Sequence, residues 1–204
     1  MNLTDWISLA LAIAGYVLGS IPFGIVVSRM FGTADPCIAG SRNIGFTNVL
    51  RVGGKAAGLC TLIGDVGKGW VIAWAAFRTI EPEGLMLAVA ATPILGHLYS
   101  IFLRFRGGKG VATAIGAVTA VAPIIGLGMV IVWLLTAALW RYSSGAAVAA
   151  FLAFPFLAVG IGTGWRFQIF AFGISSLILF RHKANVVRLM KGNEPKIGKR
   201  PIAT

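Results

Sequence analysis

The sequence predicts an all-α integral membrane protein with seven transmembrane helices, one or two of them short. The mean hydropathy is +0.86, and only 12% of the 204 residues are charged, whereas a soluble domain carries about 25%. Four long runs contain no Asp, Glu, Lys or Arg: Trp6–Ser28, Leu85–Leu103, Val111–Trp140 and Tyr142–Trp165. A helix needs roughly 20 apolar residues to cross a bilayer, and backbone in hydrocarbon must bond to itself, so we expect helices here.

We expect the helices at about 5–28, 56–78, 85–103, 110–122, 124–140, 143–160 and 165–181. The first is expected to be permanent, because Asp5 stands where a cleavable signal peptide carries Lys or Arg. The second contains Asp65 and Lys68, whose spacing of three residues puts both on one face. Pairing would make their burial tolerable, and we favour a structural over a functional role for this pair. The third contains His97 near its cytoplasmic end, and we expect this side chain either to line a site or to support the packing of the helix.

The run Val111–Trp140 is too long for one crossing. As one helix its 30 residues would extend about 45 Å, against a hydrocarbon core of ~30 Å. Pro123 breaks its middle and predicts a hairpin there. The resulting helix 110–122 is short for a full crossing, so we expect other parts of the protein to cover it in part or the bilayer to be thin around it.

The hairpin at Pro123 also sets the predicted topology. With it, the segments 29–55, 104–110, 141 and 181–204 share one side of the membrane and hold 15 of the 18 basic residues. Because basic residues mark cytoplasmic loops, the N-terminus is predicted outside and the C-terminus in the cytoplasm.

Repeats, net charge, cysteines and metal-binding motifs limit the classes of function that the chain can have. We find no internal repeat or low-complexity linker, so residues 1–204 are predicted to be a single membrane-embedded domain, and we expect a monomer. The net charge of +12 is interpreted as cytoplasmic loops that face anionic membrane lipids, with no nucleic acid as partner. Cys37 and Cys60 lack CxxC spacing and are predicted to be free thiols. No HExxH motif, Cys/His cluster or group of acids predicts a metal, and we expect no cofactor.

A first polar cluster spans Gly40–Arg51. Its hydroxyl, amide and guanidinium groups are supplied by Ser41, Arg42, Asn43, Thr47, Asn48 and Arg51. A guanidinium such as that of Arg51 holds a phosphate with two parallel hydrogen bonds. The spacing supports equally well a loop in which Thr47 or Asn48 caps a short helix.

A second cluster, Phe105–Thr113, contains Gly107, Gly108, Lys109 and Gly110 immediately before a predicted helix. Backbone N–H groups at a helix N-terminus attract anions, and glycines let a phosphate approach closely. The segment is not a Walker A loop, because Gly110 stands where that motif has Ser or Thr. The alternative is a flexible turn whose basic residues mark the cytoplasmic side; we favour phosphate binding.

A third cluster, Arg181–Glu194, lies where the last helix reaches water. His182 and Asn185 are three residues apart, which places them on one helical face. A lone interfacial histidine is more often structural or solvated than catalytic. Glu194 is the only acid in this basic tail, and we expect it to form an ion pair that fixes the tail.

Taken together, these clusters resemble the bacterial acyl-phosphate:glycerol-3-phosphate acyltransferases of membrane phospholipid synthesis. The matching pieces, in family order, are Gly19–Gly24, Gly40–Arg51, Asp65 with Lys68 and Gly69, Gly96-His97, Phe105–Thr113, Arg181–Leu189 and Gly192–Gly198. Each piece alone is weak evidence, but together they cover nearly the whole chain and are specific. Arg42, Ser100 and Ala184 depart from the family pattern, and none of them replaces a residue assigned to chemistry.

The resemblance implies a seven-helix fold in the bacterial inner membrane with an active site at the cytoplasmic face. It implies the first acylation step of phospholipid synthesis: transfer of a fatty acyl group from acyl phosphate to the 1-hydroxyl of glycerol 3-phosphate, giving lysophosphatidate and phosphate. Neither acyl-CoA nor a metal is used in the family. By resemblance, Ser41 and Arg51 are essential, Gly107–Gly110 bind glycerol 3-phosphate, His182 and Asn185 are catalytic, and Glu194 is structural.

Our mechanistic hypothesis gives each substrate its own cluster. The acyl phosphate is expected to be held by Ser41, Thr47, Asn48 and Arg51, and Asn43 is expected to bind substrate. His182 with Asn185 would orient the attacking hydroxyl, and the base is either His182 or the donor's own phosphate. The rival from another class is a membrane transporter of a phosphorylated small molecule, for which the same basic loops are suitable.

Overall fold

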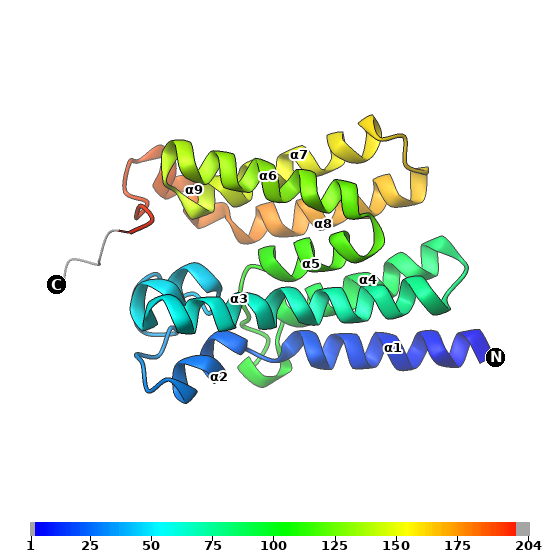
Figure 1. The fold of residues 1–204 in the computed structure, drawn as a ribbon, viewed down its shortest axis with the longest axis horizontal. Coiled ribbons are helices and arrows are strands. Elements are labelled where there is room, and N and C mark those ends of the chain that lie inside the picture. The colour runs from blue at the N-terminus through cyan, green and yellow to red at the C-terminus, as the bar shows by residue number, and fades with distance from the viewer. Residues whose placement is uncertain (1–2, 199–204) are drawn as a thin grey trace.

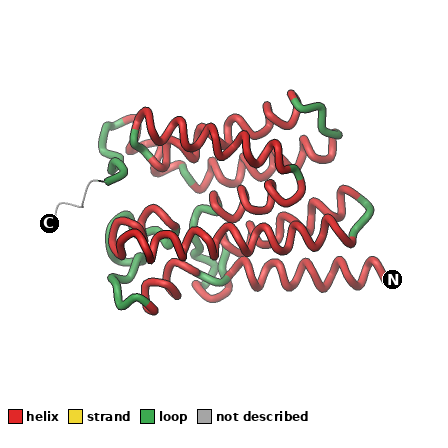
Figure 2. Tube along the Cα trace, in the orientation of Figure 1, coloured by secondary structure: helices red, strands yellow, loops and turns green. Residues whose placement is uncertain are grey.

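The computed structural model describes residues 3–198, and within this range the chain is helical, without strands. The α-helices are α1 (Leu3–Ser20), α2 (Phe23–Met30), α3 (Phe46–Thr79), α4 (Glu83–Leu98), α5 (Val111–Val121), α6 (Pro123–Trp140), α7 (Ser143–Gly160), α8 (Trp165–Arg181) and α9 (Lys183–Met190), with a 3₁₀ turn η1 at Ile101–Leu103. Figure 2 shows that short loops join most of these helices.

The long helices lie side by side with their axes roughly aligned (Figure 1). Helices α1, α3 and α4 form one half of the molecule and α6, α7 and α8 the other, with α5 between the two halves. The short helices α2 and α9 lie at the end of the molecule opposite the N-terminus (Figure 1). The polar clusters of the sequence therefore gather towards one end.

The outer surface of the helices is strongly apolar. Leu9, Ile63, Trp74, Leu135 and Phe172 are each at least 45% exposed, and a water-soluble monomer rarely shows apolar patches of such extent. Five segments of the described chain are long and apolar enough to cross a membrane: Leu3–Ser20, Phe46–Thr79, Glu83–Leu103, Pro123–Trp140 and Ser143–Gly160. Helices α5 and α8 are shorter, with 11 and 17 residues.

Helix α5 is enclosed by its neighbours, as expected for such a short helix. Thr113, Ala114, Ala117 and Val118 are fully buried. A β-carbon at Gly116 would overlap the carbonyl oxygen of Val66, so α5 packs against α3 almost backbone to backbone.

The prediction of one helix over 5–28 was wrong. The chain breaks between α1 and α2 at Ile21–Pro22, because proline has no N–H to donate and disfavours helical geometry in the residue before it. The carbonyl groups freed at the break are bonded from elsewhere: Ser100 Oγ donates to Ser20 O at 2.6 Å and Lys68 Nζ to Ile21 O at 3.0 Å.

Two further boundaries differ from the prediction. Helix α3 begins at Phe46, ten residues before the predicted start, and changes direction at Gly54, whose φ of 85° suits glycine. The helix predicted over 85–103 ends at Leu98 and continues as η1. The helices predicted over 110–122, 124–140, 143–160 and 165–181 are confirmed to within one residue at each end.

Candidate active site

The three polar clusters meet around one cavity of about 400 Å³. Its polar lining consists of Ser41, Asn43, Thr47, Asn48, Arg51, Asp65, His97, Lys109, Gly110, Ser143, Ser144, His182, Asn185 and Glu194. Among the residues predicted for the site, Gly107, Gly108 and Lys68 are not part of this lining. The chain therefore brings together residues from α3, α7, the C-terminal segment and the loop Gly107–Gly110, hereafter the glycine loop.

Asn48 organises the loop that carries Ser41. It is 1% exposed, and its amide nitrogen donates to the carbonyl oxygens of Pro36, Ala39 and Asn43 at 2.9–3.0 Å. Its Oδ1 accepts the backbone N–H of Ser41 at 2.8 Å. Asn48 thus shapes the loop from inside, and direct contact with a substrate stays a prediction for it.

Neither Thr47 nor Asn48 caps helix α3, contrary to the alternative interpretation of this cluster. The residue before α3 is Gly45, without a side-chain cap. Thr47 instead shares a hydrogen bond of 2.7 Å with Ser143 at the start of α7. This bond joins the two halves of the molecule at the edge of the cavity, while Arg51, one turn further along α3, faces the cavity half-buried.

The glycine loop is held from both sides. Gly107 N–H donates to Leu98 O at 3.1 Å and Gly108 N–H to His97 O at 3.0 Å. From the other side, Arg181 Nη2 donates to the carbonyl oxygens of Gly107 and Gly108 at 2.9 and 3.0 Å. The loop ends in Gly110, with a φ of 79°, and α5 then begins with its N-terminus at the cavity. The unpaired N–H groups and dipole of this first turn favour an anion there.

A chain of hydrogen bonds connects the loop with the C-terminal segment. Lys109 Nζ donates to Asn185 Oδ1 at 2.6 Å, and Asn185 Nδ2 donates to Glu194 Oε1 at 2.7 Å. Ser144 Oγ reaches the same oxygen at 2.6 Å, and Arg188 Nε pairs with Glu194 Oε2 at 2.7 Å. The ion pair expected at Glu194 is confirmed, with Arg188 as the partner.

The surroundings shift the pKa values of Lys109 and Glu194. Burial lowers the pKa of Lys109 to about 8; Glu194 opposes this effect, and Arg188 and Arg181 add to it. Burial alone would raise the pKa of Glu194, but hydrogen bonds from Ser144, Asn185 and Arg188 outweigh it, so its pKa lies below the ordinary value. At neutral pH the ammonium and the carboxylate are both charged.

His182 faces the cavity as a neutral ring. It is 2% exposed, and Nδ1 lies 2.8 Å from the carbonyl oxygen of Ile178. Since a carbonyl only accepts, Nδ1 carries the hydrogen and Nε2 is left as an acceptor. Burial lowers the pKa of His182 to about 4; the bond to Ile178 works in the opposite direction, and the charge of Lys109 lowers it further. Such a ring accepts a hydrogen bond from a hydroxyl but is a weak base.

Beyond the polar groups the cavity continues between apolar helices. Its apolar lining includes Leu62, Val66 and Trp70 of α3, Ile115 of α5, and Val130, Trp133 and Leu134 of α6, with Thr119 of α5 at the far end. Along α5 it reaches from Val111 to Thr119, about 12 Å at ~1.5 Å per residue. Trp70 and Leu134 are 39% and 55% exposed, so this part of the wall reaches the outer surface.

This combination, a cation-rich head with an apolar extension, agrees with the comparisons with known proteins. The family model described as "Glycerol-3-phosphate acyltransferase" matches residues 9–192. This chain belongs to the glycerol-3-phosphate acyltransferase family. The resemblance stated from the motifs is confirmed, and the chain is an enzyme of this family.

Curated relatives named glycerol-3-phosphate acyltransferase match over nearly their whole lengths. A protein of Bordetella pertussis is 47% identical over 201 residues, covering 95% of this chain and 93% of the relative. One of Aromatoleum aromaticum is 48% identical over 192 residues, covering 93% and 96%.

Two crystal structures of PlsY (YgiH), described as an integral membrane glycerol 3-phosphate acyltransferase, share the fold. Its glycerol 3-phosphate form has a TM-score of 0.89 and 36% identity, covering 94% of this chain and 96% of that chain. Its lysophosphatidic acid form has a TM-score of 0.87 and 35% identity, covering 94% and 95%. This member of the glycerol-3-phosphate acyltransferase family is therefore an integral membrane protein.

Sequence reasoning missed two serines of the site. Ser143 and Ser144 open α7 and bond to Thr47 and Glu194, respectively. Their signal in the sequence was slight: two adjacent serines that follow Arg141 and Tyr142, at the predicted cytoplasmic end of an otherwise apolar run.

Proposed function

We propose that this chain transfers a fatty acyl group from acyl phosphate to the 1-hydroxyl of glycerol 3-phosphate, giving lysophosphatidate and inorganic phosphate. One observation carries the proposal: a single cavity has cations, hydroxyls and a helix N-terminus at one end and apolar helices at the other. The polar end suits two phosphate groups, and the apolar end suits a fatty acyl chain. Membership of the family and the two forms of PlsY support glycerol 3-phosphate as acceptor.

The proposed topology has seven crossings, α1 and α3 to α8, with α2 and α9 at the cytoplasmic surface. The basic residues support it, because the loops beside α2, the glycine loop and α9 carry most of them. The acids Asp5, Glu81 and Glu83 belong to the opposite side. With bacterial relatives, we place the chain in the inner membrane as a monomeric, single-domain enzyme whose polar site opens to the cytoplasm.

Each substrate is assigned to one part of the polar cavity. Lys109 and the first turn of α5 would hold the phosphate of glycerol 3-phosphate, because point charge and helix dipole act there together. Ser41, Thr47 and Arg51, on the opposite wall, would hold the phosphate of the donor. Asn43 and Asn48 would keep that wall in shape, since Asn48 bonds to both Ser41 and Asn43.

The chemistry then needs alignment and charge stabilisation. The glycerol 1-hydroxyl attacks the carbonyl carbon of the acyl phosphate, the bond from that carbon to the phosphate oxygen breaks, and the hydroxyl proton leaves on the released phosphate. His182 would accept the hydroxyl's hydrogen bond and direct the attack, with Asn185 fixing Lys109 beside it. Because the pKa of His182 is about 4, we favour the donor's phosphate over His182 as the base.

The reaction is tested with the purified chain in detergent. Glycerol 3-phosphate is incubated with palmitoyl phosphate in one tube and palmitoyl-CoA in another, and lysophosphatidate is measured. The proposal predicts product from palmitoyl phosphate alone. Product from palmitoyl-CoA alone would overturn the donor assignment. No product from either, in folded protein, would favour the transporter, since transport needs two compartments.

Variants test the two phosphate sites separately. Lys109→Ala should raise the KM for glycerol 3-phosphate more than that for the donor, and the reverse would exchange the two sites. Ser41→Ala should reduce turnover strongly. Its matched control is Ser176→Ala, which removes an exposed α8 hydroxyl that donates to a backbone carbonyl of its own helix.

A further inference from the structure

A buried polar network lies against the glycine loop, and two of its members, Asp65 and His97, also line the cavity. Asp65, Lys68, His97 and Thr113 come from α3, α4 and α5 and are 1%, 3%, 4% and 0% exposed. Ionisable groups inside a membrane protein are expensive to bury, so such a cluster calls for a functional explanation.

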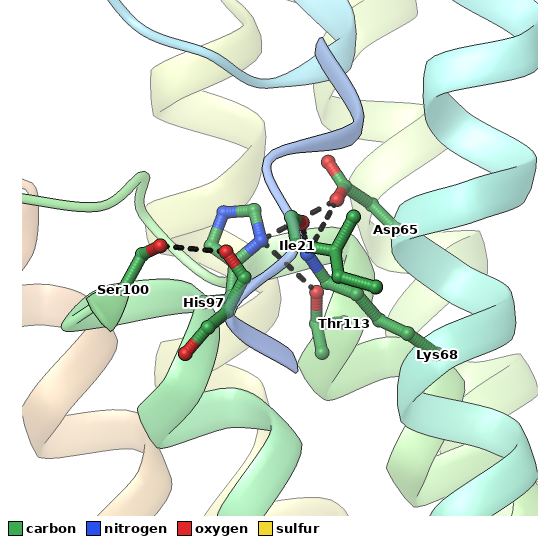
Figure 3. Close-up of polar contacts among 7 residues, drawn as sticks. Ile21, Asp65, Lys68, His97, Ser100 and Thr113 are labelled. Atoms are coloured by element: carbon green, nitrogen blue, oxygen red, sulfur yellow. Dashed lines mark hydrogen bonds and ion pairs between the residues drawn. The ribbon is translucent and has the colours of Figure 1, made fainter. Parts of the chain in front are cut away.

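Asp65 connects the two arms of this network. One oxygen, Oδ1, lies 2.8 Å from Lys68 Nζ and 3.4 Å from His97 Nδ1, and Thr113 Oγ1 lies 3.3 Å from the same ring nitrogen (Figure 3). The Lys68 arm ends at the break between α1 and α2, on the carbonyl oxygen of Ile21. The His97 arm ends at the glycine loop.

The contact between His97 and the loop is close enough to require glycine. A β-carbon at Gly108 would overlap Nε2 of His97. Unlike Gly110, Gly108 does not adopt a positive φ, so its backbone conformation would allow other residues. Glycine is required at this position because the His97 ring occupies the place of a side chain. The ring also has little freedom to move away, because Nδ1 faces Asp65 and Thr113.

We infer that His97 is a positioning residue for glycerol 3-phosphate, acting through Gly108 and oriented by Asp65. The inference rests on the proposed function, because the loop is the assigned acceptor site. His97 supports the loop from one side and Arg181 holds it from the other. A loop fixed before binding loses less freedom when the substrate arrives, so its support should appear in acceptor affinity.

The first test is His97→Asn. The shorter amide retains a polar group near the place of Nδ1 but removes the half of the ring that contacts Gly108. The KM for glycerol 3-phosphate should rise about 10- to 100-fold, the effect of a small displacement in an aligned site. The KM for palmitoyl phosphate should stay within about twofold of wild type. The matched control is Thr61→Val, which removes a buried α3 hydroxyl that donates to Ala57 O of its own helix.

A double variant tests the contact itself. Gly108→Ala alone should raise the KM for glycerol 3-phosphate, because its methyl group meets the ring. In the combination with His97→Asn the methyl group enters the space that the ring vacates, so the combined effect should fall well below the product of the two single effects. Effects that multiply, or KM values for donor and acceptor that rise equally, would overturn the inference.

Calorimetric titration with glycerol 3-phosphate, together with melting curves, separates this inference from the proposed function. A wild-type protein that binds the acceptor but forms no lysophosphatidate refutes acyl transfer. His97→Asn protein that binds it as tightly as wild type refutes the role of His97. If His97→Asn does not fold, Asp65→Asn replaces it, since it retains the side-chain size while weakening the hold on Nδ1, and the same shift in acceptor affinity is expected.

Discussion

Lys109 should set the alkaline limit of glycerol 3-phosphate use. Its pKa is lowered to about 8, chiefly by burial, and the ammonium must be charged to attract phosphate. The competent free enzyme is therefore present below pH 8 and is lost as the pH rises through that value. Above it, kcat/KM for glycerol 3-phosphate should fall about tenfold per pH unit. A phosphate monoester completes its second ionisation near pH 6, so the fall belongs to the enzyme. At saturating substrate the bound phosphate raises the pKa of Lys109 again, and kcat should fall only at higher pH.

Lys109→Arg provides the decisive comparison. A guanidinium stays charged beyond pH 12, so this variant should have a lower kcat/KM at pH 7 but a flat profile to pH 10. The assay measures initial rates of lysophosphatidate formation from pH 6 to 10, with palmitoyl phosphate saturating, glycerol 3-phosphate limiting and donor hydrolysis subtracted. An alkaline fall shared by wild type and variant would refute the assignment of Lys109.

Three further predictions concern other parts of the cavity. His182→Ala should lower kcat about 100-fold, because the attacking hydroxyl is no longer oriented. Since the pKa of His182 is about 4, the pH profiles of kcat for wild type and this variant should have the same shape between pH 6 and 7; an inflection present in wild type and absent from the variant would show that the ring titrates there. Glu194→Gln should lower the free energy of unfolding by about 1–3 kcal/mol at pH 7, whereas the control Glu81→Gln, at an exposed position, should not. Since the pKa of Glu194 is lowered, the difference between wild type and Glu194→Gln should vanish as the pH falls through that pKa. Equal melting temperatures for the two proteins at pH 7 would contradict this role of Glu194. Thr119→Trp fills the far end of the cavity, so it should raise the KM for palmitoyl phosphate more than that for decanoyl phosphate; equal effects would show that the chain lies elsewhere.

Local patterns were enough for much of the fold. The starts of α6 and α7 follow from uncharged runs interrupted at Pro123 and Arg141, and most of α8 is the uncharged run between Arg166 and Arg181. The break at Pro22 was not predicted, because the apolar run continues through it. What makes the break tolerable is Lys68, a hydrogen-bond partner 47 residues away, which no local pattern reveals.

In the candidate site, too, local spacing predicts some contacts, whereas others depend on how distant segments pack. The pairing of Asp65 with Lys68 was predictable because a helix places residues three apart on one face. Their third partner, His97, depends on how α4 packs against α3, which requires the tertiary structure. Asn48 was predicted to bind a substrate, and this stays a prediction; its hydrogen bonds to Ser41 and Pro36, which hold the loop in shape, could not be read from the sequence because they depend on how the loop folds over α3.

The most direct test is whether phosphate release requires the acceptor. Purified enzyme in detergent is mixed with palmitoyl phosphate, and phosphate is followed before and after glycerol 3-phosphate is added. If both substrates must align in one cavity for direct transfer, phosphate should stay at the blank level, without a burst, until glycerol 3-phosphate arrives. It should then appear in equal amount with lysophosphatidate. A burst of phosphate equal to the enzyme, or steady release without acceptor, would contradict direct transfer between two aligned substrates.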